Sequence, residues 1–191
     1  MRMRTAAVAF AVVTLGIGLH GQSPERTAPA LPTYQADFAG RLASASANAQ
    51  HENRRVLVVW GSNADKPSQD FILTMMRTPE LARTLLYEYE IVRVEFPGNE
   101  AAAGKFKATP AADGLPYLTV LDAQGAVLAN HPVAPFKGTG TGAAAWDGRK
   151  LNDTLTKYKP AYVEAEPLLA AALDRAKREN KTLFLWFNAP W

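Results

Sequence analysis

The spacing of apolar residues along residues 34–160 predicts alternating helices and strands. Apolar side chains three and four positions apart indicate amphipathic helices, and short apolar runs rich in β-branched residues indicate buried strands. The predicted helices cover residues 34–53, 62–89, 99–108 and 146–159, and the predicted strands cover residues 54–61, 90–96, 117–122 and 126–130. We expect Pro79 to divide the second helical stretch, because proline removes an intrahelical hydrogen bond.

The order of these elements predicts the fold class. It runs helix, strand, helix, strand, helix, strand, strand, helix. Strands separated by helices imply parallel pairing, whereas Ala123-Gln124-Gly125 joins the last two strands as an antiparallel hairpin. The sequence therefore predicts an α/β domain over residues 34–160, with a small mixed sheet and helices on both of its faces.

Two short motifs, together with this element order, carry a resemblance to a known family. "GLPYLTVLDAQG" places Pro116 directly before the hairpin, and "WGSNADKPS" follows the first core strand. The chain resembles the thioredoxin family, which has a cis-proline at the first of these places and a C-x-x-C motif, preceded by tryptophan, at the second. The resemblance implies a thioredoxin-like fold for residues 34–160.

The residues that match the redox motif lack its chemistry. In this alignment Ala64 stands at the tryptophan, Asp65 at the first cysteine and Ser68 at the second. Thiol–disulfide exchange requires a thiolate, and the sequence contains no cysteine. We therefore expect Asp65 to cap the following helix, and we predict no catalytic residue and no redox activity for the chain as given. Ser68 as a nucleophile is disfavoured, because neither His51 nor His131 is spaced with an acid to activate it.

A binding surface is the activity that the resemblance leaves open. The family accepts extended peptides in a groove beside the cis-proline, through strand-like backbone pairing. The candidate lining residues here are Ala64, Asp65, Leu115, Pro116 and Tyr117. A peptide or a partner domain at this groove is therefore the predicted ligand.

Other classes of site receive little support from the composition. After residue 21 the sequence has two histidines, His51 and His131, which are isolated and do not make a metal site. The glycine-rich residues 138–145 follow a hairpin rather than the opening strand of a βαβ unit, so we interpret them as a connector and not as a phosphate loop. No basic stripe with interleaved aromatic residues is present, which argues against nucleic-acid binding. The sequence predicts neither a metal nor a cofactor.

The first residues have the pattern of an export signal. Arg2 and Arg4 precede the uncharged apolar stretch Thr5–Leu19, which is short for a membrane span, so residues 1–21 are predicted to be a signal peptide. Residues 22–33, rich in proline and alanine, are predicted to be a linker. Removal of the signal peptide lowers the formal charge from +3 to +1. The expected location is the periplasm or the extracellular medium, with no membrane contact beyond the signal segment; an uncleaved anchor is the alternative.

The last residues repeat the beginning of the domain. "ENKTLFLWFNAPW", Glu179–Trp191, aligns without a gap with "ENRRVLVVWGSNA", Glu52–Ala64, and each follows an alanine-rich helical stretch. Residues 161–191 are therefore predicted to be the truncated start of a second thioredoxin-like domain, consisting of a helix and its first core strand. In this register the next residue would match the first cysteine of a C-x-x-C motif.

Three functions follow from these observations. The first is an exported, redox-inactive thioredoxin-like module that binds a peptide or partner. The second is the N-terminal fragment of an envelope thiol–disulfide oxidoreductase whose C-x-x-C motif lies beyond Trp191, and the third is a decaying fragment without selected activity. If the protein exists as given, the apolar run Leu183–Phe187 would be unpaired, which predicts low solubility or self-association.

Overall fold

The computed structural model describes residues 30–186 of the chain. The predicted signal peptide, most of the predicted linker and Phe187 of the terminal apolar run lie outside the described residues.

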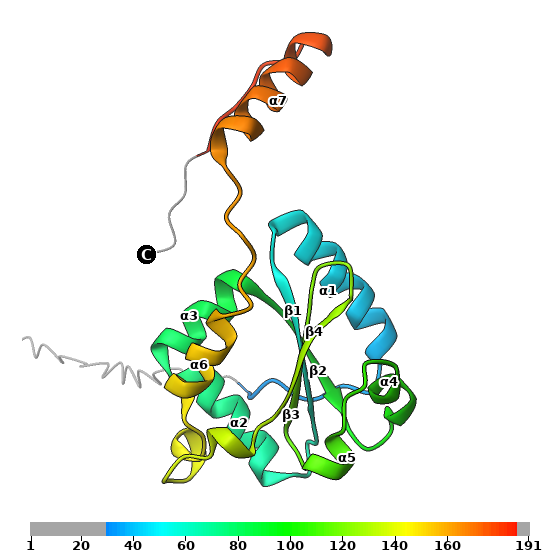
Figure 1. Cartoon of the computed structure of the whole chain (residues 1–191), viewed down its shortest axis with the longest axis vertical. Helices are drawn as coiled ribbons and strands as arrows, with labels where there is room; N and C mark the ends of the chain where they lie inside the picture. Colours follow the sequence, from blue (N-terminus) through cyan, green and yellow to red (C-terminus); the bar gives the residue numbers. More distant parts are fainter. Residues whose placement is uncertain (1–29, 187–191) are drawn as a thin grey trace, which may run out of the picture. The chain divides into compact units, whose positions relative to one another are not determined.

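A mixed sheet of four strands forms the centre of the domain. Its strands are β1 (Arg55–Gly61), β2 (Tyr89–Glu95), β3 (Tyr117–Leu121) and β4 (Val127–Pro132), and they lie in the order β2-β1-β3-β4. β1 is parallel to β2 and antiparallel to β3, and β3 and β4 form a hairpin. Figure 1 shows helices on both faces of this sheet. The predicted α/β architecture is confirmed.

The helices follow the sequence pattern closely. They are α1 (Phe38–Glu52), α2 (Lys66–Arg77), α3 (Pro79–Glu88), α4 (Glu100–Lys105), α5 (Pro110–Asp113), α6 (Gly148–Thr156) and α7 (Ala165–Arg178), with the 3-10 turns η1 (Ala134–Phe136) and η2 (Gly142–Ala144). The predicted break at Pro79 is confirmed, because Thr78 has an extended backbone between α2 and α3.

Each face of the sheet has its own apolar cluster. β1 supplies both, because neighbouring side chains of a strand point to opposite faces. Leu57 and Val59 pack with residues of α2, α3 and α6, whereas Val58 and Trp60 pack with residues of α1 and α4. All four are at most 1% exposed. The domain therefore has a layer of helices on each face of the sheet, and the central strand β1 is buried from Val56 to Gly61.

Two expectations about the ends of the domain are corrected. The first helix begins at Phe38 rather than at residue 34, because Gln35 forms a parallel bridge with Val94 and Asp37 caps the helix by accepting from the Gly40 N–H. Residues 181–186 form no strand, although residues 183–187 were expected to. A strand needs a neighbour to pair its backbone groups, and no described strand pairs with these residues.

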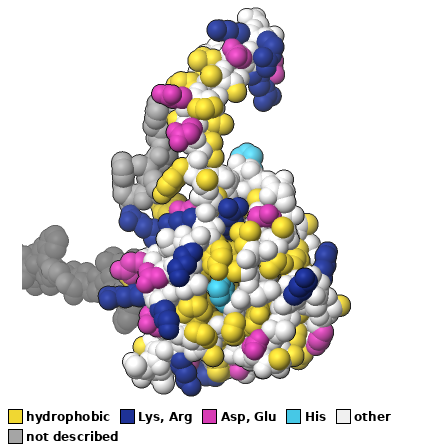
Figure 2. Space-filling view, viewed as in Figure 1, with side chains coloured by type: hydrophobic (Ala, Val, Ile, Leu, Met, Phe, Trp, Pro, Cys, Tyr) yellow, Lys and Arg dark blue, Asp and Glu magenta, His cyan; other side chains and the backbone are white. Residues whose placement is uncertain are grey.

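The helix α7 is amphipathic but buries none of its residues. Its apolar side chains Leu168, Leu169 and Leu173 are exposed, and Figure 2 shows hydrophobic side chains along this helix. Within residues 30–186, no helix is long and apolar enough to cross a membrane.

The C-terminal ends of α1 and α7 have the same backbone geometry. Asn53 and Asn180, which follow these helices, both adopt a left-handed conformation, with φ of 52° and 49°. After each asparagine the next N–H donates to a carbonyl five residues back, from Arg54 to Ala49 at 2.8 Å and from Lys181 to Ala176 at 2.9 Å. This is the hydrogen bond that closes a Schellman motif. The two helices thus end alike at positions that the repeat alignment makes equivalent.

Candidate functional site

The candidate site lies where β1 and β3 meet the same end of the sheet. Trp60 pairs with Tyr117, so the loop that follows β1 and the Leu115–Pro116 segment that precedes β3 leave the sheet side by side. Figure 1 shows the start of α2 and the short helix α5 at this end. The Leu115–Pro116 peptide bond is cis.

Asp65 and Ser68 form a hydrogen-bonded pair at the start of α2. Asp65 is the N-cap residue, and its Oδ2 accepts from the Ser68 N–H at 2.9 Å and from the Ser68 Oγ at 2.6 Å. Pro67 occupies the first turn, where its missing N–H costs nothing. A cap of this kind stabilises a helix by about 1 kcal/mol. The two positions that were predicted to match the cysteine pair are thus joined by a short hydrogen bond.

Ser68 is completely buried, and its backbone is fixed by a distant tyrosine. The Tyr34 hydroxyl donates to the Ser68 carbonyl at 3.0 Å, and burial raises the pKa of Tyr34, so the phenol stays protonated. The Ser68 hydroxyl faces a carboxylate acceptor and has no histidine partner among the described residues. The Ser68 hydroxyl therefore donates to the carboxylate of Asp65, which fixes its orientation at the start of α2.

Glu95 holds the loop between β1 and α2. It lies opposite Gly61 in the parallel pairing of β1 and β2. Its carboxylate accepts from the Ser62 Oγ and the Asn63 Nδ2, both at 2.6 Å, and from the Asn63 N–H. Asn63 in turn bonds both the N–H and the carbonyl of Tyr34, at 2.9 and 2.8 Å. The loop that presents Ala64 and Asp65 is therefore anchored from two other segments of the chain.

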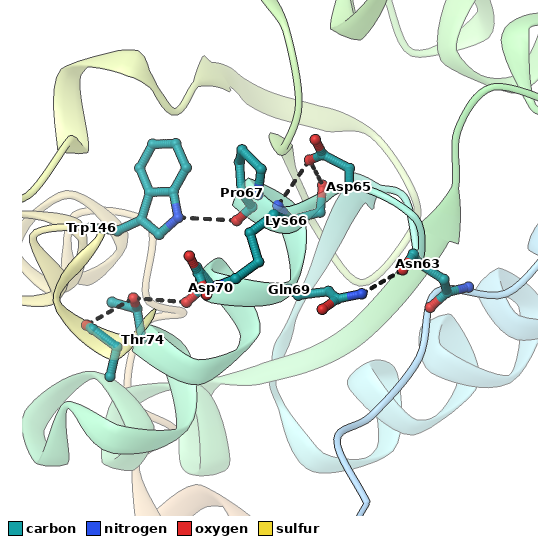
Figure 3. A network of polar contacts seen from close by, with 10 residues as sticks. Asn63, Asp65, Lys66, Pro67, Gln69, Asp70, Thr74 and Trp146 are labelled. Atoms are coloured by element: carbon teal, nitrogen blue, oxygen red, sulfur yellow. Dashed lines mark hydrogen bonds and ion pairs between the residues drawn. The ribbon is translucent and has the colours of Figure 1, made fainter. Parts of the chain in front are cut away.

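A second polar network joins α2 to the segment between β4 and α6 (Figure 3). Lys66 is ion-paired with the buried carboxylate of Asp70, one turn later in the helix. The Trp146 indole N–H donates to the Pro67 carbonyl at 3.1 Å, and the Thr74 hydroxyl lies 3.0 Å from the Ala143 carbonyl. The connector between β4 and α6 therefore packs on α2. The glycine-rich residues 138–145 act here as a support for the helix.

The candidate groove residues are placed unequally. Ala64 is exposed, Asp65 and Leu115 are half-buried, and Pro116 is buried. Tyr117 was expected to line the groove, but its side chain is 3% exposed and belongs to the cluster on the α1 face. The reason is strand alternation, which directs residue 117 into the core beside Trp60. Its hydroxyl lies 3.2 Å from the Thr109 Oγ, so it supports the segment that leads to Pro116.

The remaining candidate residues show structural contacts. The His131 Nε2 lies 3.1 Å from the Tyr158 hydroxyl, and burial lowers the pKa of this histidine, with a further contribution from Lys157. His51 lies exposed at the end of α1. Within residues 30–186, no three His, Cys, Asp or Glu side chains converge as a metal-binding group.

Sequence reasoning missed Tyr34 and Glu95 as parts of this site. They contact the loop across 29 and 33 positions of sequence, so no local pattern reports them. One signal was available for Glu95. The C-terminal ends of parallel neighbours meet at the same edge of a sheet, which places the end of β2 beside the loop after β1.

Comparison with solved structures identifies the fold. A disulphide isomerase from Xylella fastidiosa Temecula1 matches with a TM-score of 0.50 and 18% sequence identity, over 68% of this chain and 98% of that protein. The fold is thioredoxin-like. A DsbH oxidoreductase (TM-score 0.41, 21% identity, 71% of this chain and 94% of that protein) and a thioredoxin from Thermus thermophilus (0.43, 15%, 67% and 88%) also match.

The sequence itself shows no match to a described group. No protein-family model and no curated protein matches the chain. At 18% identity the structural likeness establishes the fold alone. A thioredoxin-like fold without a single cysteine fits a redox-inactive protein, because thiol–disulfide exchange needs sulfur.

Proposed function

We propose that the chain is an exported, redox-inactive thioredoxin-like module that binds an extended peptide or a partner domain beside Pro116. The observation that carries the proposal is the Asp65–Ser68 hydrogen bond of 2.6 Å. It replaces the reactive pair with a fixed contact, while the loop and Pro116 remain at the shared end of the sheet. In this proposal the surface formed by the loop and Pro116 can bind a ligand although it cannot carry out thiol–disulfide exchange.

The charge and burial of the site support a non-covalent role. Ala64 is exposed and Asp65 half-buried on a loop anchored by Glu95 and Tyr34, so a ligand would meet a surface that is already ordered. Leu115 offers apolar contact area at the same end of the sheet. Extended ligands bind such surfaces through backbone pairing, with side chains selecting the sequence.

The test uses an unfolded, carboxymethylated protein as a source of extended segments. Ala64→Trp should weaken its binding about tenfold, since a bulky side chain would fill the mouth of the groove. Ala47→Trp, on the exposed side of α1, is the matched control and should leave binding unchanged. An insulin-reduction assay should show no activity. Equal binding by both variants would refute the placement of the groove, and insulin reduction would refute the redox-inactive assignment.

A second candidate function rests on the matching helix ends. The same left-handed asparagine and the same closing hydrogen bond after α1 and α7 support the proposal that residues 161–191 begin a second thioredoxin-like domain. A full-length product of that kind would be a thiol–disulfide oxidoreductase, with the first domain placing substrates. The coding DNA tests this directly. A cysteine codon after Trp191, and another three positions later, would support it, whereas a resequenced stop codon would contradict it.

A further inference from the structure

The free edge of β2 is paired at one residue only. β2 pairs with β1 along its whole length, and on its other side with Gln35 through a single parallel bridge at Val94. In that bridge the Gln35 N–H donates to the Arg93 carbonyl and the Glu95 N–H donates to the Gln35 carbonyl. Because backbone groups alternate along a strand, Ile91 also directs its N–H and carbonyl outward. No strand within residues 30–186 pairs with Ile91.

Two hollows flank this edge. One, of about 470 Å³, lies on the side of α2 and α3, and the other, of about 560 Å³, lies on the side of α1. Ile91 lines both. Met76 and Leu86, which line the first hollow, are 47% and 62% exposed. An added strand would therefore find room for its side chains on both faces of the sheet, with apolar surface on the first.

Two arginines at this edge, Arg93 and Arg41, have no ion-pair partner among the described residues. Arg93 projects from β2, and its Nε is buried without a hydrogen-bond partner. Burial lowers the pKa of Arg93, and the nearby Arg41 of α1 lowers it further. Within residues 30–186, neither arginine has a carboxylate at ion-pair distance. A half-buried cation without a partner gains from an incoming carboxylate, so such a ligand would be favoured.

The acidic residues at the same edge are already engaged. Glu90 pairs with Arg54 at 2.8 Å, and Asp37 accepts from the Gly40 N–H as the cap of α1. A second copy of the chain is a poor occupant, because its own β2 edge carries the same two arginines and its acidic residues there are engaged in the same way.

We propose that the free edge of β2 binds an acidic peptide segment in extended conformation, which pairs with Ile91 and places carboxylates at Arg93 and Arg41. This surface is distinct from the groove beside Pro116 and involves different elements. Its ligand chemistry is also different, since recognition depends on ion pairs as well as on backbone pairing.

The experiment measures fluorescence anisotropy of a labelled peptide that alternates valine and glutamate over about eight residues, a common strand length. With the full chain at low salt, we expect saturable binding. Arg93→Gln and Arg41→Gln should each weaken it about tenfold, because each removes a charge-assisted contact. Arg149→Gln, on the exposed start of α6, is the matched control. Raising the ionic strength should weaken binding to the unchanged chain.

Strand pairing is tested separately from charge. Ile91→Pro removes an N–H that faces away from β1, and proline is tolerated in this setting on edge strands, so the fold should persist while binding is lost. If that variant does not fold, N-methylation of alternate peptide amides answers the same question. One alternate set should abolish binding and the other should not. Four results would overturn the proposal. The peptide does not bind, or a peptide with glutamine in place of glutamate binds equally well. Alternatively, neither set of N-methyl groups weakens binding, or the chain forms a concentration-dependent dimer that Ile91→Pro abolishes.

Discussion

Asp65 and Ser68, which the sequence alignment predicts to match the two cysteines of the C-x-x-C motif, bring two side-chain oxygen atoms together. Their hydrogen bond at 2.6 Å shows that the side chains at the N-cap and at the third helical position point toward each other. The geometry at the start of a helix brings these two side chains together, whichever residues stand there. Thiol–disulfide exchange, in contrast, would require cysteine at both positions.

Cysteines introduced at both positions should therefore form a disulfide. We expect the double variant Asp65→Cys/Ser68→Cys to form an intramolecular disulfide in oxidised glutathione, because a helix N-terminus favours the attacking thiolate. Thiol titration and mass spectrometry before and after reduction measure it. The two single variants are the controls and should take up glutathione or stay reduced. Two titratable thiols in the oxidised double variant would show that the positions do not match a C-x-x-C motif.

His131 gives the protein a predictable response to acid. Burial lowers its pKa, with a further contribution from Lys157, so the folded state binds a proton less readily than the unfolded state. Stability from this residue is then fully present above its unfolded pKa of about 6.5 and is lost as the pH falls through that value toward the lowered folded pKa. Urea denaturation between pH 8 and about pH 5 should show this loss, and His131→Gln should reduce its slope. An unchanged slope in that variant would exclude His131 as its source.

The elements of the domain were predictable to different degrees. α2 begins where "ADKPS" indicates, because Asp65 caps it and Pro67 occupies its first turn, and both signals lie within four residues. The start of α1 was misplaced, since the bridge of Gln35 to Val94 depends on a strand far along the chain. For the same reason the roles of Tyr34 and Glu95 in the site were not predictable. Local chemistry therefore predicts the start of α2 but not the start of α1, which depends on a contact distant in sequence.

The end of β1 shows how closely two elements can approach. A Cβ at Gly61 would lie 2.4 Å from the Tyr34 ring. Tyr34 is fixed there by the Ser68 carbonyl and by Asn63, so the ring has little freedom to move away. The glycine lets the segment before α1 cover the end of the central strand, beside the candidate site.

Gly61→Ala should accordingly destabilise the fold by about 1–3 kcal/mol, the usual cost of overpacking a rigid site. Gly104→Ala is the matched control. Its added Cβ would meet no atom within 4 Å, and alanine is the better helix former, so a neutral or slightly stabilising effect is expected. Chemical denaturation of both variants measures the difference. A Gly61→Ala variant as stable as the Gly104→Ala variant would show that Tyr34 does not hold its position.

At the scale of the whole molecule, the domain and the residues after it have opposite character. The buried residues of both apolar clusters end at Leu155, and the Arg55 Nε holds the Tyr158 carbonyl at 2.9 Å as α6 ends. After that point, the large apolar side chains of the described residues are mostly exposed, among them Tyr162 at 91% and Phe184 and Trp186 at 79%. The buried apolar side chains up to Leu155 stabilise the domain, whereas the exposed ones after it can contact another molecule.

Removal of the residues after Lys159 should therefore make the protein more soluble and more uniformly monomeric. The shortened chain keeps both apolar clusters and gives up an exposed hydrogen bond from Asn53 to the Ala161 carbonyl, so its free energy of unfolding should change little. Contiguous exposed apolar surface drives association, so the full chain should elute from size exclusion as larger or mixed species. Phe184→Ser/Trp186→Ser in the full chain separates this effect from chain length, and it should shift the protein part of the way toward the monomer. Light scattering across a concentration series measures the mass of each form. If the full chain is as soluble and monomeric as the shortened one, its exposed apolar side chains do not mediate self-association.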